Sequence, residues 1–163
     1  MDSKQAITDS LPIPNQNAWI RLLKIFPSKS GKNHYELITF HFHDHPPYKA
    51  ISYAWGDPES SRYVSIVQGR RQGWLKVPVN LHAALETLRD KTEDVLVWAD
   101  SVCINQQDNG EKNQQLPRIP AIYGNADQVV VWLGVEMDDS KRAQELLLKA
   151  EETPLDSSPH SID

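Results

Sequence analysis

The sequence predicts an α/β fold in which helices flank a mostly parallel β-sheet that carries an inserted or edge β-hairpin. Apolar runs with the composition of strands alternate along the chain with stretches whose apolar residues recur every three or four positions. The run 94–99 is apolar almost throughout, which is typical of a strand covered on both faces. This order of patterns favours repeated crossovers onto a parallel core.

The first predicted element is a strand that begins near Trp19. Residues 1–17 are mostly polar and contain Pro12 and Pro14, so we expect a disordered lead there. The apolar run 20–26 ends at a cluster of turn-forming residues, which favours a strand over a short helix. A second strand is predicted over 35–42.

The middle of the chain predicts a buried strand and a hairpin. The aromatic-rich run 48–55 stops at the turn signal Gly56-Asp-Pro58. Two short β-type runs, 64–67 and 74–77, flank a connection with two glycines, which indicates a hairpin.

A helix is predicted next, with Asn80 as its N-cap. Its apolar stripe has the spacing i, i+3, i+4 and i+7, formed by Leu81, Ala84, Leu85 and Leu88. The strand 94–99 follows and ends at Asp100. That carboxylate is therefore expected where a strand becomes a loop.

The last third of the chain predicts a helix, a buried strand and a final helix. The first helix has one apolar face made of Leu116, Ile119, Ile122 and Tyr123. Because it contains Pro117 and Pro120, it starts late or is broken. A buried strand is predicted over 128–133 and a helix over 140–151, and the tail 153–163 is disordered by composition.

Composition bounds the kind of protein. With 163 residues and 39% apolar composition, the chain predicts one domain, over 18–152. A net charge of -5 leaves no basic surplus for a phosphate backbone, so nucleic acid is not an expected partner. The single cysteine, Cys103, excludes an intrachain disulfide and fits a reducing compartment. With no signal-like or membrane-spanning apolar run, the expected location is the cytoplasm.

Three blocks of residues carry a family resemblance. They are Tyr48-Lys-Ala-Ile-Ser-Tyr-Ala-Trp-Gly-Asp57, then Leu96-Val-Trp-Ala-Asp-Ser-Val-Cys-Ile-Asn-Gln106 with Asp108 and Glu111, then Ile122-Tyr-Gly-Asn-Ala126 leading into Val129-Val-Val-Trp-Leu-Gly134. Together they resemble the HET (heterokaryon incompatibility) domain family of filamentous fungi over residues 48–134. No single block would suffice, whereas three at this spacing are highly specific.

The resemblance implies a role in non-self recognition and programmed cell death, a form of innate immunity. Such a domain is expected to act by self-association or by binding protein partners. HET domains are often attached to sensor modules. Since this chain ends soon after the third block, it resembles an isolated or truncated HET module.

HET domains are distantly similar to TIR domains, which implies a TIR- or flavodoxin-like architecture. Some TIR domains cleave NAD with a glutamate on the helix after the strand that corresponds to 129–133. In such a reaction NAD would be a substrate of this chain and not a cofactor. Glu145 is the matching residue, and Glu136 is the nearer competitor. A carboxylate there can stabilise an oxocarbenium-like transition state. Glu145 is alternatively a solvated helix residue beside Lys141 and Lys149.

Polar residues at two predicted strand ends form a candidate pocket or signalling loop. The set is Trp55, Gly56, Asp57, Asp100, Cys103, Asn105, Gln106, Asp108 and Glu111. The structural alternative is that short polar side chains such as Asp100 and Asn105 bond backbone groups to fix a long loop.

Cys103 and the histidines each offer a further chemistry and a simpler role. Cys103 has no histidine near it in the sequence, and small buried thiols are usually inert, which argues against a nucleophile. His41, His43 and His45 alternate as metal ligands could, but Pro46-Pro47 ends any strand there. We therefore favour a solvated strand end, with no metal. Three hypotheses remain: an assembly module, an NAD-cleaving effector, and an inactive fragment.

Overall fold

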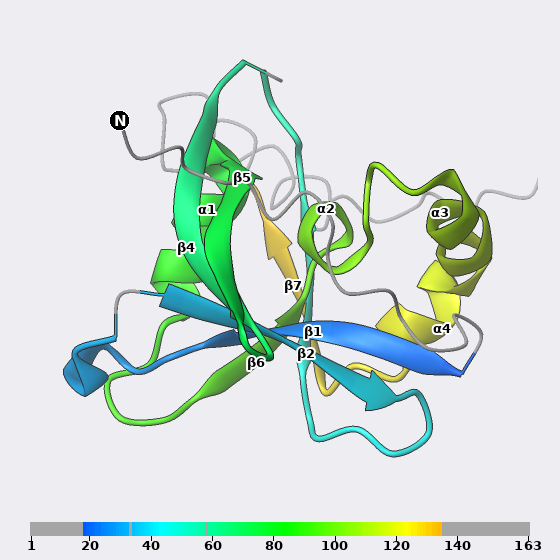
Figure 1. The fold of residues 1–163 in the computed structure, drawn as a ribbon, viewed down its shortest axis with the longest axis horizontal. Helices are drawn as coiled ribbons and strands as arrows, with labels where there is room; N and C mark the ends of the chain where they lie inside the picture. Colours follow the sequence, from blue (N-terminus) through cyan, green and yellow to red (C-terminus); the bar gives the residue numbers. More distant parts are fainter. Residues whose placement is uncertain (1–17, 33, 58, 135–163) are drawn as a thin grey trace, which may run out of the picture.

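The computed structural model describes residues 18–32, 34–57 and 59–134. Their strands form one mixed sheet in the order β5-β4-β2-β1-β6-β3-β7 (Figure 1). The strands are β1 Trp19–Ile25, β2 His34–His41, β3 Lys49–Tyr53, β4 Ser61–Gln68, β5 Arg71–Pro78, β6 Val95–Trp98 and β7 Gln128–Trp132. The helices are α1 Val79–Leu88, α2 Asp100–Cys103, α3 Asn109–Gln115 and α4 Ile119–Gly124, with two 3-10 turns, η1 Ser28–Ser30 and η2 Leu116–Arg118.

The predicted α/β class is confirmed, whereas the prediction of a mostly parallel sheet is wrong. β1 runs antiparallel to both of its neighbours, β2 and β6, and β4 is antiparallel to β5. The reason for the first pair is the short connection 26–33, because parallel neighbours need a crossover of about a dozen residues or more. The parallel pairs are β2 with β4, and β3 with β6 and β7.

The three adjacent strands that run parallel are β6, β3 and β7. From β3 the chain moves to one side to form β6, and it then crosses back over β3 to form β7 on the other side. The first connection contains α1, and the second contains α2, α3 and α4. The carboxyl ends of all three strands therefore lie at one edge of the sheet, where open α/β sheets usually hold their ligands.

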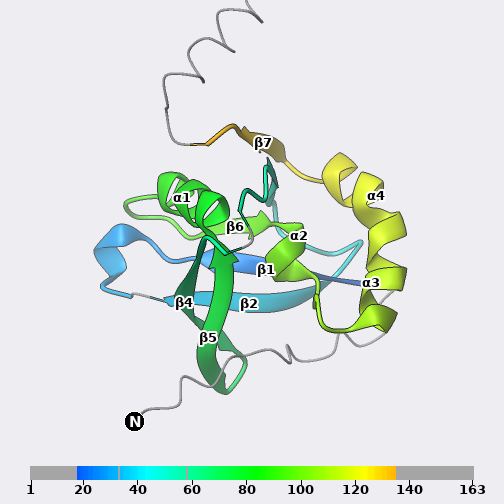
Figure 2. The ribbon, with the colours of Figure 1, turned by 90° about the horizontal axis from the view of Figure 1, so that it is seen from above.

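Helices cover both faces of the sheet. The hydroxyl of Tyr35 donates a hydrogen bond of 2.5 Å to Glu86 of α1, so α1 lies on the face to which Tyr35 points. The registers of β1 put Val97 on that same face, so its neighbour Trp98 points the other way. Trp98 packs edge-on against Tyr123 of α4, with ring centroids 5.6 Å apart. Seen from above, α1 and α4 lie to either side of β7 (Figure 2).

The core is built around β1, the central strand. Every residue of β1 between Ile20 and Ile25 is buried except Lys24, because layers pack on both of its faces. The predicted strands at 20–26, 35–42, 48–55 and 94–99 are all confirmed, with ends shifted by a few residues.

The predicted hairpin is also confirmed, as β4 and β5 at one edge of the sheet. Gln68 pairs with Arg71, so two residues make the turn. Gly69 takes a positive φ of 59°, which such a turn requires at its first central position. Arg70 and Arg71 are exposed at this tip.

The helix predicted after the site loop is broken, as its prolines allowed. Asn109–Gln115 forms α3, the segment with Pro117 forms η2, and Pro120 lies in the first turn of α4. A proline there lacks only a donor that the helix would not use. The expected shared apolar face is wrong in part, because Ile122 is fully buried and Leu116 is 51% exposed.

The prediction that the last strand is buried is wrong. β7 pairs only with β3 among the described strands and forms an edge of the sheet. Val129, Val131 and Leu133 are 47%, 64% and 75% exposed. An apolar sequence of this kind is typical of a buried strand, but no described layer covers these three side chains.

Several predictions fall outside the described residues. These are the lead 1–17, the helix 140–151 with Glu145, the competitor Glu136 and the tail 153–163. The predicted domain limits stay predictions. In the described part of the chain, no helix is both long and apolar enough to cross a bilayer.

Candidate functional site

A cavity of about 220 Å³ opens at the carboxyl ends of the parallel strands. Its walls come from the turn after β3, from the near ends of β4 and β5, and from the loop after β6. The lining residues are Trp55, Gly56, Asp57, Ser60, Ser61, Lys76, Pro78, Ser101 and Gln106. The fold thus joins parts of the first two motif blocks, which are far apart in the sequence.

The turn after β3 is fixed by α1. The side-chain amide of Asn80 donates a 3.0 Å hydrogen bond to the carbonyl oxygen of Ala54. Gly56 has a φ of +70°, and a Cβ at this position would lie 3.2 Å from the amide nitrogen of Asn80. Glycine is therefore favoured by both its φ and the close approach. The predicted role of Asn80 as N-cap is wrong, because Pro78 precedes α1 and Asn80 binds the neighbouring turn instead.

Trp55 and Asp57 face the cavity from this turn. Trp55 is 52% exposed, so much of its indole is open to a ligand or a partner. The carboxylate of Asp57 accepts from the Glu59 amide at 3.0 Å and from the Ser60 hydroxyl at 3.3 Å. Both bonds hold the turn, and the carboxylate itself remains exposed.

The loop after β6 supplies the opposite wall. The Gln106 side chain donates to the carbonyl oxygens of Asp100 and Ile104, at 2.9 and 3.3 Å. The carboxylate of Asp100 accepts from the amide of Ser101 at 2.7 Å, at the start of α2. Asp100 is therefore next to the cavity but is absent from the residues that line it.

Ser101 is positioned from below by Tyr53, whose hydroxyl donates to the Ser101 hydroxyl at 2.5 Å. Burial raises the pKa of Tyr53 above its ordinary value, and the charge of Asp100 raises it further. The phenol therefore stays protonated over the physiological range. It acts as a fixed hydrogen-bond donor beneath the cavity.

Other side chains of the segment after β6 point into the core. Arg21 and Glu111 form a bidentate ion pair, with nitrogen–oxygen distances of 3.0 and 3.1 Å, and both side chains are almost fully buried. Arg21 also donates to the carbonyl oxygen of Cys103 at 3.0 Å, and the backbone amide of Asn105 donates to the Glu111 carboxylate at 2.8 Å. The pair therefore ties both ends of the loop to β1.

Asn105 and Asp108 complete this scaffold. The Asn105 side chain accepts from the Gln107 amide at 3.0 Å. Asp108 is the N-cap of α3, where its carboxylate accepts from the amide of Glu111 at 3.1 Å. These bonds are those of the structural alternative, in which short polar side chains fix the loop.

Cys103 is 1% exposed, and burial raises the pKa of its thiol to about 12. The sulfur lies 3.9 Å from the carbonyl oxygen of Val97. A thiol that stays protonated and enclosed is a poor nucleophile. This agrees with the inert role that we favoured.

The alternating histidines pack against aromatic rings. His41 meets Trp19 edge-on with ring centroids 5.5 Å apart, and His45 meets Tyr48 at 4.9 Å. Within residues 18–134, apart from the two undescribed positions, no three His, Cys, Asp or Glu side chains are grouped as metal ligands would be.

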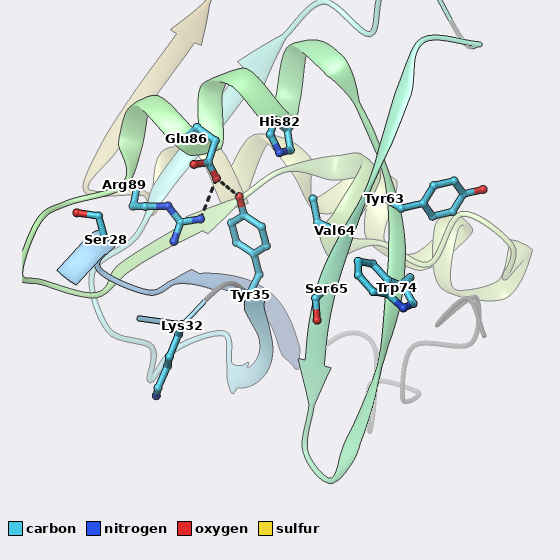
Figure 3. A pocket seen from close by; sticks show the side chains of 10 residues that line it. All are labelled: Ser28, Lys32, Tyr35, Tyr63, Val64, Ser65, Trp74, His82, Glu86 and Arg89. Carbon is cyan, nitrogen blue, oxygen red and sulfur yellow. Dashed lines mark hydrogen bonds and ion pairs between the residues drawn. The ribbon is translucent and has the colours of Figure 1, made fainter. Parts of the chain in front are cut away.

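A second cavity, of about 470 Å³, lies between α1, β2 and the hairpin. Figure 3 shows Tyr35, Glu86 and Arg89 linked on one side of it and Trp74 on the other. Arg89 donates to Glu86 at 2.8 Å, and this bond above all lowers the pKa of the Glu86 carboxyl. None of these groups was singled out as a functional residue from the sequence.

The structure therefore divides the predicted site. It brings Trp55, Gly56, Asp57 and Gln106 to one cavity. It directs Cys103 and Glu111 into the core and leaves Asn105 and Asp108 in the scaffold. Sequence reasoning missed Arg21, although a charged residue inside the apolar run 20–26 is a usable sign of a buried ion pair.

Comparisons with known proteins agree with the motif blocks. The family model for the heterokaryon incompatibility protein (HET) matches residues 48–162. Heterokaryon incompatibility protein 6, OR allele, of Neurospora crassa is 33% identical over 159 residues, which cover 91% of this chain and 23% of that protein. The chain thus spans less than a quarter of the length of this relative. No solved structure matches it.

Proposed function

This chain belongs to the heterokaryon incompatibility (HET) family, and from that premise we propose that it is a signalling module for fungal non-self recognition. It acts in the cytoplasm by self-association or by binding protein partners, and its output is programmed cell death. The relative of similar sequence is named for heterokaryon incompatibility, which supports this role.

The observation that carries the proposal is the exposed Trp55 beside a rigidly held cavity. Its indole is 52% exposed, and the turn that presents it is anchored by the Asn80 bond to Ala54. Large, rigid aromatic side chains contribute most to protein interfaces when a partner covers them. A surface that is ordered before binding also loses less conformational entropy on association.

The test compares Trp55→Ala with the control Tyr63→Ala in fungal cells that express the full chain. Trp55 and Tyr63 are exposed to the same degree, 52% and 53%, but Tyr63 does not line this cavity. We expect Trp55→Ala to abolish cell death and concentration-dependent association, and Tyr63→Ala to keep both. Equal behaviour of the two variants, with both folded, would contradict the proposal.

A second candidate function is NAD cleavage by a TIR-like effector. Its support is the position of the cavity at the carboxyl edge of the parallel strands, where open α/β sheets bind nucleotides. Asp57 is the carboxylate on the cavity wall, and Glu145 is the residue that the resemblance implies.

The enzyme hypothesis predicts nicotinamide release from NAD by the concentrated, purified chain. The release should disappear in Glu145→Gln or Asp57→Asn and persist in Asp100→Asn, since Asp100 does not line the cavity. No release from folded protein would leave assembly or an inactive HET module. An inactive module would in addition show neither association nor cell death.

A further inference from the structure

The second cavity, between α1, β2 and the β4–β5 hairpin, has the size of a small-molecule site. Its volume is about 470 Å³, within the range of about 300–1,000 Å³ that is usual for sites that enclose a small ligand. The cavity beside Trp55, at about 220 Å³, is smaller than this range. None of the described residues that line the second cavity belongs to the three motif blocks. A ligand bound there would therefore be separate from the surface around Trp55.

Arg89 supplies a rigidly held cation on the helix side of this cavity. Its guanidinium donates to the carbonyl oxygen of Phe26 at 2.7 Å and to the Glu86 carboxylate at 2.8 Å. It also lies over the ring of Tyr35, 5.1 Å from the ring centroid. Contacts with three separate segments fix its position, and a charge that is fixed before binding loses little conformational entropy when an anion arrives.

The described residues that line the cavity carry more positive than negative charge. Glu86 is the one carboxylate among them, and it is already matched by Arg89 and by the hydroxyl of Tyr35, which donates to it at 2.5 Å. Lys32 is a second cation. Its side chain is exposed and extends away from Glu86 in Figure 3, so it can turn toward a ligand with little loss of packing. The surplus of one positive charge would be balanced by a ligand with a single negative charge.

Neutral polar groups add hydrogen-bonding capacity without changing this balance. His82 of α1 and Ser65 of β4 both line the cavity. Burial lowers the pKa of His82 below its ordinary value, so its imidazole is mostly neutral at pH 7 and offers one donor and one acceptor. The Ser65 hydroxyl can also donate and accept. Both side chains can therefore bind an oxygen atom of a carboxylate.

Trp74 supplies a flat apolar wall on the hairpin side. It pairs with Ser65 across the hairpin, so both side chains stand on the same face of β4 and β5. The indole is half-buried, and Figure 3 shows it across the cavity from the linked side chains of Tyr35, Glu86 and Arg89. A flat aromatic ring packed on an indole is stabilised by more than the burial of its area. The cavity therefore has a charged side and an aromatic side.

We propose that this cavity binds a small organic acid with one carboxylate on a flat aromatic ring. The ring packs on Trp74, and the carboxylate is met by Lys32, Arg89 and His82. Because the two requirements come from different walls of one cavity, neither a bare anion nor a neutral ring satisfies both. This inference is independent of the proposed signalling function and of NAD cleavage, since neither uses these residues.

The first test titrates the isotope-labelled full chain with 2-naphthoate and follows its indole N–H signals by NMR. The signal of Trp74 is the one missing from the spectrum of Trp74→Phe, and that of Trp55 is assigned in the same way. We expect the Trp74 signal to shift and to saturate below about 10 mM ligand. A shift of the Trp55 signal in its place, or no saturation at that concentration, would overturn the proposal.

Two matched probes separate the charge from the ring. 2-Naphthamide has the same ring without the charge, and acetate has the carboxylate without the ring. We expect each to bind at least about tenfold more weakly than 2-naphthoate, because each loses the contacts of one wall. A smaller difference for either probe would overturn the proposal.

Two variants separate Lys32 from a general effect of surface charge. Lys32→Gln should weaken the binding of 2-naphthoate about threefold, the size expected for an exposed ion pair. Lys29→Gln removes the same charge from η1, at a residue that does not line the cavity, and it should leave the dissociation constant unchanged. Both positions are exposed, so both variants should keep the fold. Equal dissociation constants would show that Lys32 does not meet the ligand and would overturn the site.

Discussion

The segment after β6, from α2 to α3, contains two sets of side chains that use similar residue types for different purposes. Cys103, Asn105 and Glu111 join the core or its scaffold through the buried Arg21. Ser101 and Gln106 instead turn their side chains to the cavity. The difference teaches that a dense polar motif is not one site. The buried side chains hold the segment to β1, and the side chains at the cavity line a surface that is open to a ligand or a partner.

The largest expected effect is among the buried side chains, from Glu111→Ala. Removing this carboxylate leaves Arg21 buried without its ion partner, which costs about 3–5 kcal/mol of the free energy of unfolding. Urea denaturation measures this loss, and Glu93→Ala, at an exposed position, is the control with little effect. A loss below about 1 kcal/mol would show that the two sets of side chains do not differ as we describe.

The reactivity of Cys103 is a second measurement of how firmly the buried side chains after β6 are enclosed. Burial raises its thiol pKa to about 12, so the folded chain should react very slowly with a thiol reagent at pH 8. At pH 10 this thiol should still be almost entirely protonated and should still react slowly, whereas an exposed thiol would then be mostly ionised. In Glu111→Ala the loop opens more often, and labelling should be at least about tenfold faster. Fast labelling of the unaltered chain would contradict the enclosed position.

An intermediate effect is expected where the cavity meets the fold, from Gly56→Ala. Gly56 and Gly31 both have a φ of 70°, which costs an alanine about 1–2 kcal/mol. A Cβ on Gly31 would meet nothing within 4 Å, whereas one on Gly56 would approach Asn80 at 3.2 Å. Gly31→Ala is thus the matched control, and thermal unfolding should show a larger loss for Gly56→Ala. Equal losses would mean that the Asn80 contact is unimportant.

A smaller effect is expected from the scaffold residue Asp108. Asp108→Ala removes the N-cap of α3 and should cost about 1 kcal/mol. Asp108→Asn keeps a side-chain acceptor and should restore most of the stability in the same denaturation experiment. If the two variants were equally destabilised, the charge of Asp108 would matter more than its hydrogen bond.

The smallest effect on stability is expected from Trp55→Ala. Trp55 is 52% exposed and is not part of the core cluster, so its truncation should change the free energy of unfolding by less than about 0.5 kcal/mol. The same variant is expected to lose association and cell death, so its stability and its function would separate. A large loss of stability would place Trp55 in the folding core instead.

Much of the fold could be predicted because local patterns decide it. The apolar runs and composition of 20–26, 35–42 and 94–99 predicted the strands, and the glycines around Arg70 indicated the hairpin. The direction of β1 relative to β2 was local information, because the short connection 26–33 allows only an antiparallel pair. The antiparallel pairing of β1 with β6 was not, because it joins strands that no single segment contains.

The site could be predicted in part for the same reason. Trp55 and Gln106 follow strands whose carboxyl ends share an edge, so their meeting followed from the expected topology. The role of Glu111 could not be read from its own block, because its partner Arg21 lies 90 residues away. Likewise, the exposure of Val131 depends on what packs over β7 and not on its own sequence.

The β4–β5 hairpin makes the distribution of charge over the molecule uneven. Residues 61–78 contain four cations and no carboxylate, in a chain whose formal net charge is -5. The hairpin is therefore a positive end on a molecule that is otherwise acidic. Its field reaches about 10 Å at 0.1 M salt. Acidic surfaces that approach are turned toward the hairpin before contact, and their rate of encounter falls as ionic strength rises.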